Sequence, residues 1–159
     1  FNGKLRASDE LQNLYHIPQM GLIVMDSKKK LLPDKWVDNL RNHGKRKFTP
    51  AQSMELAVAA VKIAAVKNGL DHVCLMGCNL AEGADNVCES IKQALEKEQI
   101  AVTILDNALY NAEAMEKLEN EKGVVLVEKA GSTLYNEVAK EIELLTRQDI
   151  TVLGGIVVE

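Results

Sequence analysis

Residues 73–105, which read VCLMGCNLAEGADNVCESIKQALEKEQIAVTIL, contain the alternation that decides the fold of this chain. The apolar runs at 73–76 and 100–105 have the length of buried strands, and residues 84–97 between them have the spacing of an amphipathic helix. Strands that are apolar throughout and separated by helices are typical of a parallel sheet whose two faces are both covered. The stretch therefore predicts an α/β fold.

The same alternation continues to the end of the chain, with expected strands at 124–127 and 150–158 and expected helices at 112–120 and 134–146. Upstream, a strand is expected at 20–25 and short helices at 8–16 and 33–42. Because crossover connections between parallel strands are right-handed, these elements predict a doubly wound, Rossmann-like sheet with helices on both faces.

One helix is marked especially clearly. Thr49 and Pro50 form a strong helix start, because a threonine side chain caps free amide groups and proline suits the first helical position. The helix is expected to reach residue 67 and to end at Gly69. Its helically spaced apolar positions are Leu56, Ala59, Ala60, Ile63 and Ala64.

The bulk composition limits the classes of function. A chain of 159 residues is expected to form one domain over residues 1–159, with residues 1–48 as an amino-terminal extension of it. The net charge of −4 argues against nucleic acid as a partner. No apolar run reaches the ~20 residues of a membrane span. Because the chain begins with Phe1 rather than Met, we expect it to be a fragment of a longer protein.

The three cysteines and three histidines do not predict a metal site. The cysteines at 74, 78 and 88 are too few for a disulfide framework and have no histidine at zinc-site spacing, so we expect inert thiols. The histidines at 16, 43 and 72 are scattered and have no carboxylate partner that the sequence reveals. We therefore predict no metal.

Residues 77–86 form the loop where a ligand would be expected, because they follow a predicted strand and lead into a helix. The frame resembles a phosphate-binding loop, and Glu82 and Gly83 fit it. However, Ala84 stands at the lysine position, Asp85 at the Ser/Thr position that holds magnesium, and Ala81 at an earlier glycine. The alternative is an ordinary strand-to-helix turn with an acidic helix start.

The charges in this loop oppose nucleotide binding. Without the lysine, the carboxylates of Glu82 and Asp85 would face the anionic phosphates. Two unit charges ~4 Å apart interact by about 4 kcal/mol even at an effective dielectric constant near 20. We therefore predict that no nucleotide cofactor is bound.

Several motifs resemble those of the bacterial tyrosine kinases of capsule and exopolysaccharide synthesis, which share a deviant phosphate loop with the MinD and ParA ATPases. The matching segments are residues 72–77, 81–85, 102–106, 123–133 and 152–158. The resemblance implies a kinase-like fold related to the P-loop NTPases.

The segment from Ser8 to Ile23 is similar to the cytoplasmic segment that follows the last membrane helix of Wzz-type chain-length regulators. This resemblance implies a soluble fragment of a membrane protein at the cytoplasmic face of the plasma membrane, with residues 1–48 proximal to the membrane. It also implies a protein partner, either a kinase-like subunit or a second copy. Two basic clusters could contact anionic lipid or form solvated loops: Lys28, Lys29, Lys30, Lys45, Arg46 and Lys47.

The departures from the kinase pattern predict a pseudoenzyme. Asp106 at a strand end could be a general base or a loop cap, but Ala108 and Tyr110 replace the aspartate and arginine that follow it in the kinases. Only 16 residues separate Asp106 from Gly123, too few for the strand unit that carries the Walker B aspartate.

The oligomerising arginines of the kinases are also absent after Glu55. The prediction is a non-catalytic regulatory or docking domain of polysaccharide chain-length control. The alternatives are an active nucleotide-binding, kinase-like ATPase and an unrelated Rossmann module that binds a small ligand.

Overall fold

A computed structural model describes residues 19–23, 49–78, 80, 84–129 and 135–158. The described strands are β1 (Gln19–Ile23), β2 (His72–Gly77), β3 (Ala101–Asp106), β4 (Gly123–Lys129) and β5 (Thr151–Val158). The described helices are α3 (Pro50–Lys67), α4 (Asp85–Lys97), α5 (Ala112–Leu118) and α6 (Tyr135–Arg147). The helices expected at 8–16 and 33–42, the basic clusters and loop residues 81–83 lie outside the described residues.

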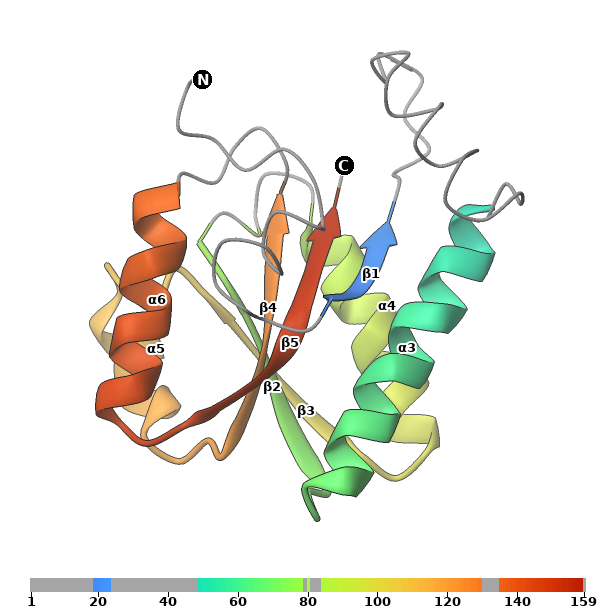
Figure 1. The fold of residues 1–159 in the computed structure, drawn as a ribbon, viewed down its shortest axis with the longest axis horizontal. Coiled ribbons are helices and arrows are strands. Elements are labelled where there is room, and N and C mark those ends of the chain that lie inside the picture. The colour runs from blue at the N-terminus through green and yellow to red at the C-terminus, as the bar shows by residue number, and fades with distance from the viewer. Residues whose placement is uncertain (1–18, 24–48, 79, 81–83, 130–134, 159) are drawn as a thin grey trace.

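The strands form one five-stranded sheet in the order β1-β5-β4-β2-β3, and every pair is parallel. Helices α3 and α4 cover one face and α5 and α6 cover the other (Figure 1). The predicted doubly wound α/β fold is therefore confirmed. Because all strands run in one direction, their carboxyl ends meet at one edge of the sheet, which we call the carboxyl edge.

Three helices end in the same way, with a residue in the left-handed conformation followed by an apolar residue whose amide reaches back five positions. The left-handed residues are Gly69 (φ 67°), Gln99 (φ 65°) and Asp149 (φ 56°). The returning amide–carbonyl bonds are Leu70 to Ala65 at 2.8 Å, Ile100 to Leu95 at 3.0 Å and Ile150 to Leu145 at 2.9 Å. Each end satisfies free helix carbonyls and places a buried or half-buried side chain just before the next strand.

Helix α3 packs with a different face from the one that its larger apolar residues suggested. The start is as expected, because the Thr49 hydroxyl accepts the amide of Gln52 at 3.1 Å. The buried residues, however, are Ala57, Val61 and Ala65, whereas Leu56 and Ile63 are 52% and 55% exposed. Apolar residues surround most of this helix, so periodicity did not define one face. Small side chains let the helix approach β1 and β5 closely.

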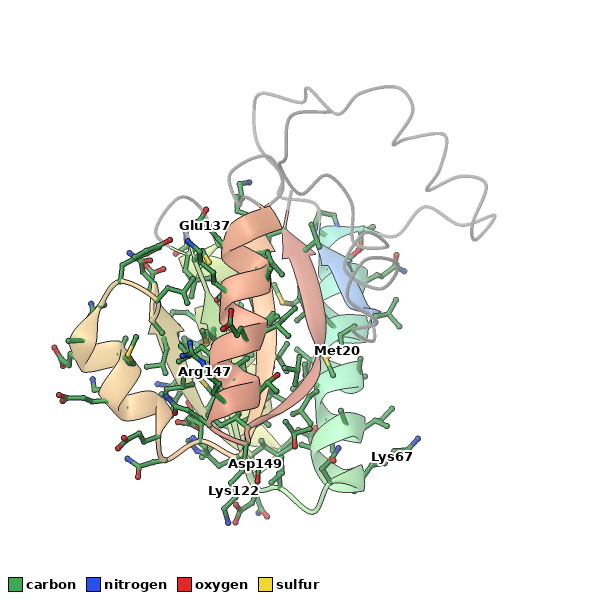
Figure 2. The ribbon with its side chains drawn as sticks, turned by 60° about the vertical axis from the view of Figure 1, so that its left-hand side comes forward. Met20, Lys67, Lys122, Glu137, Arg147 and Asp149 are labelled. Atoms are coloured by element: carbon green, nitrogen blue, oxygen red, sulfur yellow. The ribbon has the colours of Figure 1, made fainter. Side chains whose placement is uncertain are left out.

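The glycine pair in β5 reflects another close approach. A Cβ atom on Gly154 would lie 2.6 Å from Cγ and 2.7 Å from Sδ of Met20, which is a buried residue of β1 (Figure 2). The small residue in β5 therefore leaves room for the Met20 side chain of β1.

Candidate functional site

The most unusual group of side chains lies at the carboxyl edge, where β2 and β4 end beside each other. Cys78 directly follows β2, Glu128 is the next-to-last residue of β4, and Glu141 comes from the second turn of α6. The thiol and one oxygen of each carboxylate all lie within 4.8 Å of one another. We call these three residues the acidic thiol cluster.

The acidic thiol cluster is removed from water. Cys78 is 3% exposed, and Glu128 and Glu141 are 0% exposed. The backbone amide of Cys78 donates to Oε2 of Glu128 at 3.5 Å, which links the end of β2 to the end of β4. Buried carboxylates are rare unless they are protonated, paired with a cation or bound to a metal.

The electrostatics of the cluster favour the protonated forms of Glu141 and Cys78. Burial raises the pKa of the Glu141 carboxyl well above its usual value, and the carboxyl of Glu128 and then that of Glu137 raise it further. Burial likewise raises the pKa of the Cys78 thiol, to which Glu141 and Glu128 add. Glu137 lies at the amino-terminal end of α6 (Figure 2). It precedes Glu141 by one helical turn. An acidic environment therefore surrounds a thiol at the end of a parallel strand.

The degenerate loop positions lie next to this cluster along the chain. Ala84, at the lysine position of a phosphate loop, is 0% exposed and packs into the core under α4. Its amide donates to the carbonyl of Leu80 at 2.9 Å. Ala81, Glu82 and Gly83 lie outside the described residues, and so does the side chain of Asp85. The described part of the loop thus ends at a buried alanine.

Asp106 closes the other side of the same loop. It is the last residue of β3, and its Oδ1 accepts the backbone amide of Leu80 at 3.0 Å. The amide of the following residue, Asn107, donates to the carbonyl of Gly77 at 2.8 Å. Of the two roles considered for Asp106, this geometry is that of a loop cap.

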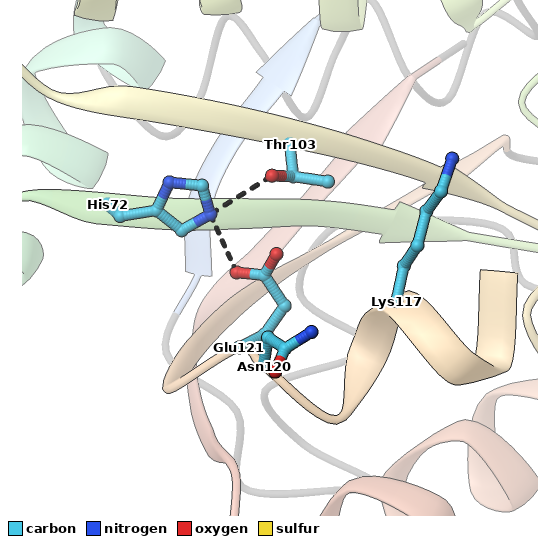
Figure 3. Close-up of a pocket in the computed structure, with 5 residues that line it drawn as sticks. All are labelled: His72, Thr103, Lys117, Asn120 and Glu121. Atoms are coloured by element: carbon cyan, nitrogen blue, oxygen red, sulfur yellow. Dashed lines mark hydrogen bonds and ion pairs between the residues drawn. The ribbon is translucent and has the colours of Figure 1, made fainter.

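A second site lies at the opposite edge, around the amino ends of β2 and β3 (Figure 3). His72 Nε2 lies 2.8 Å from Oε2 of Glu121 and 3.0 Å from Oγ1 of Thr103. With Lys117 and Asn120, these residues line a pocket of about 450 Å³. The sequence reveals no carboxylate partner for His72, but in the structure the turn before β4 brings Glu121 to the start of β2.

This second pocket is a weaker candidate than the carboxyl edge. Ligands of doubly wound sheets bind outside the carboxyl ends of the strands, and His72 is at an amino end. Its Nε2 atom is already engaged by Glu121 and Thr103. We therefore place the candidate functional site at the carboxyl edge.

Comparisons with known proteins support the fold. Neither a protein-family model nor a curated protein matches the chain. The solved structure of the "BceF Tyrosine Kinase Domain" is similar, with a TM-score of 0.62, 13% sequence identity and coverage of 98% of both chains. The chain therefore has a bacterial tyrosine-kinase-like α/β fold. None of the described helices combines the length and apolar character needed to cross a bilayer.

Proposed function

We propose that this chain is a non-catalytic, kinase-like regulatory or docking domain of capsular or exopolysaccharide synthesis. The kinase-like fold over nearly the whole chain supports the kinase-like character of the domain. The resemblance of residues 8–23 to chain-length regulators supports its place in polysaccharide synthesis.

The observation that carries the non-catalytic role is the environment of Ala84. In a working phosphate loop this position holds a lysine that reaches the terminal phosphates. Here it is a small side chain with 0% exposure, packed among the residues between α4 and the sheet. The loop therefore has no cation at the position where the kinases need one.

The neighbouring side chains support the same conclusion. Glu128 and Glu141 place two buried acidic side chains, rather than a cation, behind the strand ends, and Asp106 is engaged by the amide of Leu80. Phosphoryl transfer depends almost entirely on positioning and on positive charge around the transferred group. The described ionisable groups at this site are mainly acidic, so they do not supply that positive charge.

Calorimetry tests this proposal directly. Titration of the wild-type chain with ATP or ADP in the presence of Mg²⁺ should give no binding heat, while a nucleotide-binding bacterial tyrosine kinase domain serves as the positive control. Micromolar binding would overturn the non-catalytic role. Phosphate transfer to any tyrosine would establish the alternative, an active kinase-like ATPase.

The partner and the location are part of the proposal. We propose binding to a kinase-like subunit or to a second copy, at the cytoplasmic face of the plasma membrane. Sedimentation distinguishes the two partners. A dimer of the chain alone would indicate a second copy, and a complex formed only when a kinase-like subunit is added would indicate that subunit.

A lipid contact through the basic clusters at 28–30 and 45–47 predicts binding to vesicles that contain anionic lipid, at about 1 kcal/mol for each basic residue near the surface. Equal binding to neutral vesicles would exclude that contact.

A further inference from the structure

We propose that Cys78, Glu128 and Glu141 form a buried site for a transition-metal dication of the Zn²⁺ type. The proposal goes beyond the docking function and does not depend on it, because a metal could hold this edge together whether or not a nucleotide binds.

The geometry brings three ligands of the right kind together from three separate elements. One residue follows β2, one lies in β4 and one lies in α6. Their ligand atoms lie within 4.8 Å of one another. In a tetrahedral zinc site, Zn–S bonds of about 2.3 Å and Zn–O bonds of about 2.0–2.2 Å place neighbouring ligand atoms about 3.5 Å apart. Small side-chain rotations would bring the cluster to that spacing.

Glu141 is the residue that points to a ligand. Its side chain is 0% exposed. Outside the cluster, neither of its carboxylate oxygens meets a hydrogen-bond donor in the described part of the chain. The groups that act on it are the thiol of Cys78 and the carboxyl groups of Glu128 and Glu137, none of which is a cation at neutral pH.

An ionised carboxylate in such a place needs compensation, because removing it from water without a partner is strongly unfavourable. Two kinds of positive charge can supply it. A proton can be held within the cluster, which agrees with the raised pKa of Glu141. Alternatively, a dication can replace the protons of the cluster, since metal binding deprotonates its ligands.

The ligand set favours the dication and restricts its identity. A thiolate is a soft ligand that selects zinc and related transition metals, whereas Mg²⁺ and Ca²⁺ take oxygen ligands. Three side chains leave one coordination position for water. Histidine is not required for such a site, so the spacing of cysteine and histidine residues along the chain does not indicate it.

Co²⁺ is the probe for the test, because a thiolate bound to it gives a near-ultraviolet sulfur-to-cobalt charge-transfer band. Chelator-treated wild-type protein should develop this band with one Co²⁺ per chain, and Zn²⁺ should displace it. Cys78→Ser should abolish the band. Cys74→Ala is the matched control, because Cys74 is equally buried but lies outside the cluster, and it should keep the band.

Glu141→Gln decides whether the carboxylate takes part, because this variant keeps all three cysteines and the shape of the side chain. We expect it to weaken Co²⁺ binding at least about tenfold, since even outer-shell partners of metal ligands cost 10–100-fold in affinity. Its far-ultraviolet circular dichroism should match that of the wild type and show that it is folded.

Two results would overturn the proposal. One is a wild-type chain that develops no band and shows no thermal shift with Zn²⁺, which would mean that the cluster holds only protons. The other is a band that persists in Cys78→Ser, which would place the thiolate elsewhere. Neither result bears on nucleotide binding, so the proposed function is tested separately.

Discussion

Replacement of Glu141 by glutamine in the metal-free protein should change how stability depends on pH. The folded-state pKa of Glu141 lies well above the ordinary value of 4.5, mainly because the group is buried. Between 4.5 and the folded-state pKa, the folded chain keeps a proton that the unfolded chain has released. This group's contribution to stability is therefore complete at low pH and is lost as the pH rises through that window.

The magnitude follows from linkage. One proton held only by the folded state lowers the free energy of unfolding by about 1.4 kcal/mol for each pH unit. This slope is large relative to the 5–15 kcal/mol that stabilises a typical domain, so a change of one pH unit within the window has a measurable effect on stability.

The assay is urea unfolding followed by circular dichroism at a series of pH values, with a chelator present throughout. Relative to Glu141→Gln, the wild type should lose stability as the pH rises through the window, and the variant should be the more stable of the two at neutral pH. Glu143→Gln is the control, because Glu143 lies on the same helix but is exposed, and it should follow the wild type. Parallel curves for the wild type and Glu141→Gln would refute the reasoning.

Three further substitutions test the fold and the loop by the same unfolding measurement. Gly77→Ala should destabilise the chain by about 1–3 kcal/mol or more. The new Cβ would collide with the Val127 carbonyl and lie 2.6 Å from Cδ2 of Leu80. An unchanged midpoint of urea unfolding would contradict this packing. Val61→Ala should lower the free energy of unfolding by about 1 kcal/mol or more, whereas Ile63→Ala should change it by no more than about 0.5 kcal/mol. The reason is that, of these two residues, only Val61 is buried. Equal effects would mean that α3 packs with a different face. Asp106→Ala should cost about 1 kcal/mol by removing the acceptor for the Leu80 amide, and Asp106→Asn, which keeps an acceptor oxygen, should cost less.

Local rules predicted the element order and most of the boundaries. The strand expected at 73–76 is β2 (His72–Gly77), and the helix expected at 134–146 is α6 (Tyr135–Arg147). Alternation of apolar runs with helical spacing and the Thr49–Pro50 start depend on contacts within a few residues, so they can be read from the chain directly. The parallel, doubly covered sheet follows from them because strands without a polar side must be buried on both faces.

The buried face of α3 could not be predicted in the same way. Leu56 and Ile63 have the expected spacing but face outward, because the contact with β1 and β5 selects the small residues Ala57 and Val61. A helix that is apolar on several sides has more than one possible face, and only the sheet against which it packs decides between them.

The candidate site itself depends on long-range register. The chain alone determined that Ala84 lacks the charge of a phosphate-loop lysine, because the absence of a cation is a property of the residue. Tertiary structure alone decided that Cys78 meets Glu128, 50 residues later in the chain, and that His72 meets Thr103, 31 residues later. Such pairs form because parallel strands and their crossover helices align distant positions, and no local periodicity records that alignment.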